Sequence, residues 1–175
     1  LEGIGAVNVI VDIGANIGAA SVYLKDSYPD AALYAFEPSK ASFELLQRNL
    51  SDFNNVHLYN FGLHELDATA RLYLGKLDGI SDSVIPGLDV RDEFVEVELK
   101  SAAGELHRLD LRDIDLLKID TEGCEVPILR AMVKWLSTIK VIYLEYHSEL
   151  DRQMIDLILH RSHVLYASRD RKSVV

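Results

Sequence analysis

Apolar runs alternate with amphipathic segments along the first third of the chain. Residues 7–13 ("VNVIVDI") and 31–38 ("AALYAFEP") are apolar without strict alternation, which is typical of parallel strands buried on both faces. Residues 18–28 and 39–53 have helical spacing, and Ser39 is placed as an N-cap of the second helix. Two strand-helix units in succession predict a right-handed, parallel sheet.

The middle of the chain has a different pattern. Residues 56–63 and 70–75 are predicted as strands joined across a polar turn, which favours a hairpin. Residues 93–99 alternate cleanly and predict a strand with one solvent-exposed face. Between them, the segment from Lys76 to Asp92 has glycines, a proline and no sustained period, so we expect a lid over a site.

The last third returns to the strand-helix pattern. The predicted elements are a strand over 115–120, a helix over 121–136, a strand over 140–147, a helix over 148–162 capped by Ser148, and the start of a further strand in 164–170. Within the first of these helices, Val126, Leu129, Val133 and Leu136 are expected to form the buried stripe.

Length and composition bound the class of protein. A chain of 175 residues is expected to form one domain, 1–175, and 49% hydrophobic with 26% charged residues is ordinary globular composition. No apolar run approaches the ~20 residues that a membrane span needs. The sequence begins at Leu1 and a strand-like run follows within ten residues, so we interpret it as an excerpt of a longer protein.

Charge and cysteine content narrow the partners. With 18 basic against 28 acidic residues, the net charge of −10 makes nucleic acid an unfavourable partner, whereas a neutral or cationic small molecule is easier to accept. The single cysteine, Cys124, excludes an internal disulfide and is expected to be a small buried thiol. These features fit a reducing compartment, and we expect a cytoplasmic protein.

The turn after the first predicted strand is the most informative stretch. In an open parallel sheet, ligands bind beyond the carboxyl ends of the strands, and the "GANIG" turn of residues 14–18 lies there. Glycines permit positive φ and close approach, and Glu37 follows Gly18 by 19 residues, at the end of the second strand. A carboxylate there can accept both hydroxyls of a ribose, so a nucleoside cofactor is predicted.

The type of nucleoside stays open on these residues alone. A dinucleotide fingerprint needs glycine where this chain has Asn16, although Ala19 can serve as its small third residue. A nicotinamide-dinucleotide Rossmann oxidoreductase and a non-catalytic nucleoside-binding module therefore remain alternatives.

Four motifs in order and spacing carry a family resemblance. "VDIGANIGAAS", "FEPS", "LLKIDTEGCE" and "LEYH" together resemble the FkbM family of S-adenosylmethionine-dependent methyltransferases, over nearly the whole chain. The resemblance implies an α/β fold: the Rossmann-like class I methyltransferase three-layer sandwich with a mostly parallel sheet, here truncated at both ends. It also implies S-adenosylmethionine as cofactor and O-methylation of a hydroxyl on a small molecule or carbohydrate.

The same resemblance assigns residues to the cofactor. By matching position, Asp12, Gly14, Asn16 and Gly18 shape the methionine and ribose side, Glu37 holds the ribose hydroxyls, Asn60 and Phe61 lie by the adenine, and Asp120 borders the methionine and the transferred methyl.

Acidic residues and one histidine gather at the ends of two predicted strands. Asp120 and Glu122 follow one strand, and His147 follows the next, so we predict these three as catalytic. His147 is a candidate general base for a hydroxyl nucleophile, or alternatively a cap of the helix that starts at Ser148. Glu122 orients the substrate or accepts its proton, or is simply an acid favoured near a helix N-terminus.

A metal is the remaining alternative at this place. Asp120, Glu122, Glu145 and His147 offer the oxygen and imidazole ligands that Mg or Mn accepts. The sequence does not establish such a site, and we predict none.

Overall fold

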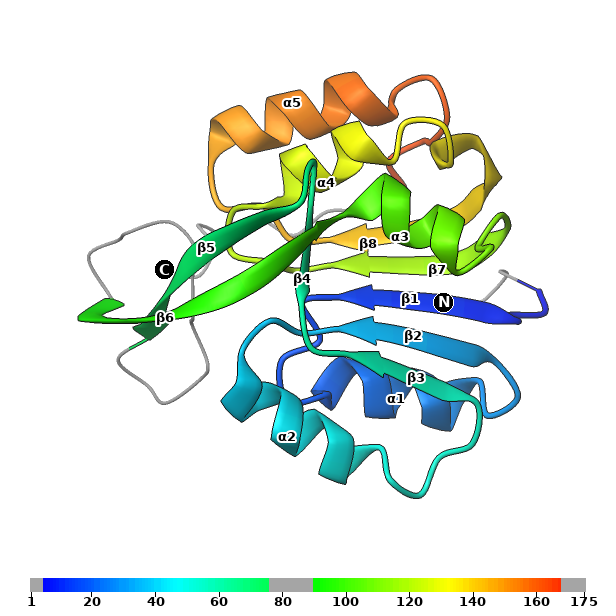
Figure 1. Ribbon diagram of the computed structural model, residues 1–175. Helices are drawn as coiled ribbons and strands as arrows, with labels where there is room; N and C mark the ends of the chain where they lie inside the picture. Colours follow the sequence, from blue (N-terminus) through cyan, green and yellow to red (C-terminus); the bar gives the residue numbers. More distant parts are fainter. Residues whose placement is uncertain (1–4, 76–89, 168–175) are drawn as a thin grey trace, which may run out of the picture.

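Two sheets organise residues 5–75 and 90–167, which are the residues that the computed structural model describes (Figure 1). The central sheet has five parallel strands. In spatial order they are β3 (Val56–Tyr59), β2 (Ala32–Phe36), β1 (Val9–Ile13), β7 (Ile114–Ile119) and β8 (Ile139–Leu144). The second sheet has the order β4 (Gly62–His64), β6 (Val90–Ser101) and β5 (Ala68–Gly75).

Helices cover both faces of the central sheet (Figure 1). The helices are α1 (Ala19–Ser27) and α2 (Lys40–Asn49) on one face, and α3 (Ala102–Arg108), α4 (Glu125–Ala131) and α5 (Glu149–Leu159) on the other, with a short 3-10 turn at Leu136–Thr138. The predicted three-layer α/β sandwich with a mostly parallel sheet is confirmed.

The core lies in two layers because the strands are apolar on both faces. On β1, Ile10 packs with the cluster under α1 and α2, whereas Val11 packs with the cluster under α3, α4 and α5. Leu116 and Leu117 on β7 divide in the same way. The absence of alternation in residues 7–13 therefore reflects burial on two sides.

Most predicted elements occur where the sequence places them. Strands over 7–13, 31–38, 115–120 and 140–147 correspond to β1, β2, β7 and β8. The two predicted serine caps are confirmed: the Oγ of Ser39 accepts from the backbone N–H of Ser42 at 3.5 Å, and the Oγ of Ser148 accepts from that of Asp151 at 3.0 Å.

The prediction of one strand over 56–63 and a hairpin with 70–75 is wrong. The segment divides at residues 60–61 into β3, which pairs with β2, and β4, which pairs in parallel with β6. β5 lies on the other side of β6 and pairs with it antiparallel. The longer strand β6 lies between the two segments predicted to form the hairpin, because β4 pairs with one of its edges and β5 with the other.

Two predictions in the last third are corrected as well. The helix predicted over 121–136 begins only at Glu125 and ends at Ala131, and Val133 is 57% exposed instead of buried. Leu129 and Leu136 are buried as expected, and Ile128 and Met132 are buried with them.

The strand predicted from Val164 is absent in 164–167, the part of that segment that the structure describes. These residues have no ladder of hydrogen bonds, and Val164 and Tyr166 are 92% and 100% exposed.

The segment between β5 and β6 bears on the predicted lid. Residues 76–89 of the Lys76–Asp92 segment lie outside the described residues, and residues 90–92 belong to β6. Among the helices that the structure describes, none has the length and apolar character to cross a membrane.

Candidate active site

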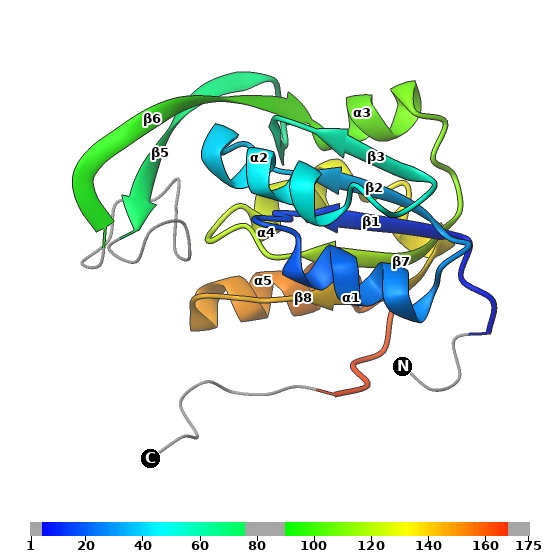
Figure 2. The ribbon, with the colours of Figure 1, turned by 90° about the horizontal axis from the view of Figure 1, so that it is seen from below.

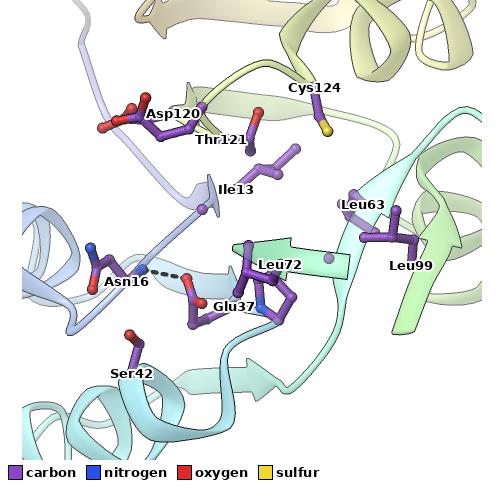
Figure 3. Close-up of a pocket in the computed structure, with 14 residues that line it drawn as sticks. Ile13, Asn16, Glu37, Ser42, Leu63, Leu72, Leu99, Asp120, Thr121 and Cys124 are labelled. Carbon is purple, nitrogen blue, oxygen red and sulfur yellow. Dashed lines mark hydrogen bonds between the residues drawn. The ribbon is translucent and has the colours of Figure 1, made fainter. Parts of the chain in front are cut away.

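A cavity lies at the carboxyl ends of the central strands, where the two sheets meet (Figure 3). All five strands of the central sheet point toward the side on which β5 and β6 project, and the view from below shows that pair arching away from the helical layers (Figure 2). The lining residues are Ile13, Gly14, Asn16, Glu37, Pro38, Ser42, Gly62, Leu63, Leu72, Leu99, Asp120, Thr121, Glu122 and Cys124.

The glycine turn is pressed against the end of β7. Gly14 has φ +77°, and a Cβ at this position would lie 1.9 Å from the backbone oxygen of Asp120. Only glycine fits because both the space and the dihedral angle exclude a side chain. Asn16 also has a positive φ, of 50°, so the turn presents its backbone N–H groups toward β2.

At the end of β2, Phe36 accepts the N–H groups of Gly14 and Ala15 with its backbone oxygen, and Glu37 accepts that of Asn16 with its side chain. Its carboxylate accepts from the backbone N–H of Asn16 and of Ser39, at 2.8 Å each, and the residue is 7% exposed (Figure 3). The Nδ2 group of Asn60 donates to the backbone oxygen of Glu37 at 2.9 Å. The acid is therefore held from three sides, and it lines the cavity.

A buried ion pair supports the turn from below. Lys118 on β7 is 8% exposed, and its Nζ lies 3.0 Å from Oδ1 of Asp12, which is fully buried. The same Nζ donates to the backbone oxygen of Gly14 at 3.0 Å and lies 3.8 Å from the carboxylate of Asp120. Ser21 on α1 donates to the other oxygen of Asp12 at 2.6 Å. One ammonium group thus joins β1, β7 and the glycine turn.

The turn after β7 forms the acidic wall of the cavity. Glu122 has φ +53°, an uncommon value for a residue other than glycine, and Gly123 has φ +117°. The carboxylate of Glu125, 1% exposed, accepts from the backbone N–H of Thr121 at 3.0 Å and from that of Gly123 at 3.1 Å. These hydrogen bonds hold the backbone that places Glu122 at the cavity.

His147 lies between two carboxylates. Its Nδ1 is 3.3 Å from Glu122 and its Nε2 is 3.5 Å from Glu125. The pKa of His147 is raised to about 8, mainly by the hydrogen bond to Glu125 and then by the charges of Glu122, Glu125 and Glu145, against the opposing effect of burial. Burial raises the pKa of Glu125, but its hydrogen bonds with His147 and backbone N–H groups outweigh burial and leave that pKa below the usual value. The ring is therefore an imidazolium at neutral pH.

The ion pairs also explain a group of residues with metal-like spacing in the described part of the chain. Ligand atoms of Asp120, Glu122 and His147 lie within 4.8 Å of one another. Both ring nitrogens of His147 already face carboxylates, so an ion-pair cluster accounts for this spacing without a cation.

The remaining wall is apolar and comes from the second sheet. Gly62, Leu63, Leu72 and Leu99 face the cavity from β4, β5 and β6 (Figure 3). A Cβ at Gly62 would lie 2.6 Å from the side chain of Leu99. Across the cavity, burial raises the pKa of Cys124 to about 12, so this residue is a neutral thiol, as expected for a buried cysteine.

The structure brings half of the predicted site residues to the cavity. Those that line it are Gly14, Asn16, Glu37, Asp120 and Glu122. The others lie around it: Asp12 beneath the turn, Gly18 at the start of α1, Asn60 behind Glu37, Phe61 in the core against Phe36, and His147 behind Glu122. Their roles toward a cofactor stay predictions.

Sequence reasoning missed two features of this site. Lys118 is a charged residue inside an apolar strand. A buried lysine needs an acidic partner, so its presence there is a signal that could have been used. The leucines of the second sheet gave no local signal, because their position depends on strand pairing distant in the sequence.

Comparison with known sequences assigns the family. Residues 12–165 match the profile of the Methyltransferase FkbM domain. The chain belongs to this family.

Several known methyltransferases share long stretches of sequence with it. The chain is 34% identical over 155 residues to methyltransferase sdnD of Sordaria araneosa and 32% identical over 143 residues to methyltransferase 1 of Beauveria bassiana. Each match covers 70% of this chain, and the chain spans 60% and 57% of the lengths of these relatives. It is also 24% identical over 155 residues to the 2-O-methyltransferase NoeI of Sinorhizobium fredii, covering 81% of this chain and 64% of NoeI.

A solved structure has the same fold. The FkbM methyltransferase of Methylobacillus flagellatus superposes with a TM-score of 0.63 at 17% identity, over 90% of this chain and 38% of that one. The FkbM domain described here therefore has the Rossmann-like fold of class I methyltransferases, as the sequence motifs predict.

Because the ion pair between Lys118 and Asp12 is buried, we expect its removal to lower the free energy of unfolding strongly. Lys118→Met leaves the Asp12 carboxylate buried without its cation, and breaking such a pair costs about 3–5 kcal/mol. We expect this loss in the free energy of unfolding, measured with urea. Lys134→Met, at an exposed lysine, is the control, and equal stability of the two variants would contradict the assignment.

His147 predicts a pH-dependent stability with a defined sign. Because its folded pKa of about 8 exceeds the ordinary 6.5, its contribution is full below pH 6.5 and is lost as the pH rises through 8. The difference in unfolding free energy between the native chain and His147→Gln should fall by at most about 2 kcal/mol between pH 6 and 9. A difference that does not change with pH would show that the imidazolium is not stabilised by its carboxylates.

Proposed function

We propose that this FkbM domain binds S-adenosylmethionine in the cavity and transfers its methyl group to a hydroxyl oxygen of a small molecule or sugar. The observation that carries the proposal is that Glu37, the Gly14–Asn16 turn and Asp120 all line one cavity at the carboxyl edge of the sheet. These are the residue types that a nucleoside cofactor needs at that edge.

The donor set fits this cofactor. Glu37 would hold the ribose hydroxyls, since its carboxylate is fixed by the N–H groups of Asn16 and Ser39. Gly14 and Asn16 would border the methionine side, together with Asp120. Asn60 fixes the backbone of Glu37, so it would support the ribose site from behind.

Charge favours this cofactor over a dinucleotide. The ionisable side chains among the described lining residues are the carboxylates of Glu37, Asp120 and Glu122 and the neutral thiol of Cys124. An acidic lining attracts a sulfonium cation and repels a pyrophosphate. The ammonium group of Lys118 is close by, but it faces Asp12 and the oxygen of Gly14.

Methyl transfer requires few catalytic groups from the protein. Bound S-adenosylmethionine supplies an electrophilic methyl group on sulfur, and the protein aligns an acceptor oxygen with it and excludes water. The proton of the acceptor hydroxyl has to be removed, and Glu122 is the base at the cavity wall. His147, which we predict from the sequence as a base, faces carboxylates with both ring nitrogens, so the geometry favours Glu122 in that role.

The proposal that oxygen is the acceptor atom is based on a protein with a similar sequence. NoeI is named a 2-O-methyltransferase, and its similarity extends over most of this chain. The apolar leucines of the second sheet would form the wall opposite the acids.

Cofactor binding is the first test. We expect S-adenosylhomocysteine to bind in a calorimetric titration and NAD, the control ligand, to give no heat. Glu37→Ala should weaken binding by about 1.5–3 kcal/mol, the range for hydrogen bonds to a charged group. Glu44→Ala, at an exposed position on α2, is the matched control. Unchanged affinity in a folded Glu37→Ala variant would remove Glu37 from the site.

The acceptor atom can be tested with labelled cofactor. A panel of hydroxyl compounds and sugars incubated with methyl-labelled S-adenosylmethionine should yield product whose label survives mild alkali, as a methyl ether does. Label released by alkali would identify a methyl ester, and label on nitrogen an N-methyl product; either result would contradict transfer to a hydroxyl. Glu122→Gln should slow the transfer.

A further inference from the structure

Glu125 is a buried carboxylate that does not line the cavity. It is 1% exposed, yet its carboxylate accepts hydrogen bonds from the turn that forms the acidic wall of the cavity. Its Oε1 accepts from the N–H and the hydroxyl of Thr121, both at 3.0 Å, and its Oε2 accepts from the N–H of Gly123 at 3.1 Å. Hydrogen bonds from N–H groups to an ionised acceptor are strong, so the carboxylate fixes this turn.

The same carboxylate extends to the end of β8 through His147. The Nε2 of the ring lies 3.5 Å from Glu125, and the Nδ1 lies 3.3 Å from Glu122. The charged groups that face the ring are Glu122 from the turn, Glu125 from α4, Glu145 just after β8, and Asp120 just after β7. Three side chains therefore form a chain from the buried interior to the cavity wall: Glu125, His147, Glu122.

We propose that Glu125 is a positioning residue for methyl transfer, which acts through His147 to hold the Glu122 carboxylate at the cavity wall. The inference rests on the function proposed above. In this proposal, the buried Glu125 supports the reaction indirectly, and His147 connects the carboxylates of Glu125 and Glu122.

The backbone explains why Glu122 needs to be held. Its side chain is 35% exposed, so solvent competes for it, and its φ of +53° is costly for a residue with a side chain. Without the negative charge of Glu125, the ring loses its buried partner and the turn loses an ionised acceptor. Glu122 would then leave its position, whereas Glu37 on the opposite side of the cavity would keep its hydrogen bonds.

The test is Glu125→Gln in the full chain, with Glu44→Gln on α2 as the matched control. An NMR titration of the ring, assigned with His147→Gln, should show its midpoint falling from about 8 toward 6.5 in Glu125→Gln. The kcat of methyl transfer should fall by up to about a hundredfold, the scale of a misplaced catalytic group, while affinity for S-adenosylhomocysteine is retained. Glu44→Gln should change none of the three quantities.

Two results would overturn the proposal. An unchanged midpoint for His147 in folded Glu125→Gln would show that the two groups are not coupled. A parallel loss of cofactor affinity and kcat would show that Glu125 only supports the fold.

Further variants keep the proposal testable. The double variant Glu125→Gln/His147→Gln should lose no more kcat than either single variant, because the residues act in one chain. If Glu125→Gln does not fold, His147→Gln carries the test, and an unchanged kcat in that variant overturns the proposal. Failure of the native chain to bind S-adenosylhomocysteine would refute the proposed function, whereas the titration of His147 still tests the coupling.

Discussion

The ion pair between Lys118 and Asp12 is the interaction on which the rest of the site depends. Asp12 is fully buried on the central strand of the sheet, and such a carboxylate is tolerated only with a compensating cation. The lysine that supplies the cation also binds the oxygen of Gly14. The position of the glycine turn, and with it the N–H of Asn16 that Glu37 accepts, follows from this pairing.

The cavity has two acidic sides that are held in different ways. Glu37 is fixed by backbone N–H groups and by the amide of Asn60 behind it, so its position depends on main-chain geometry. Glu122 is fixed through side chains, His147 and Glu125, whose ionisation changes with pH. This division suits a site that binds its cofactor on one side and carries out proton transfer on the other.

The sequence predicts those features of the site that depend on local pattern and on the order of strands. Gly14, Glu37 and Asp120 were found because each follows a buried parallel strand, and parallel strands bring their carboxyl ends to one edge. The sequence does not reveal that β4 leaves the central sheet, since its partner β6 lies about 35 residues further along the chain and is set by strand pairing. Lys118 escapes notice for a similar reason, because its partners are set by packing between elements.

The junction of the two sheets has a consequence for altering this protein. Gly62 lines the cavity, and a Cβ there would lie 2.6 Å from the side chain of Leu99. The absence of a side chain at residue 62 therefore determines the width of the cavity at this point. In protein engineering, residue 62 is a position where one methyl group, accommodated by the flexible end of Leu99, would reshape the cavity without touching any charged residue.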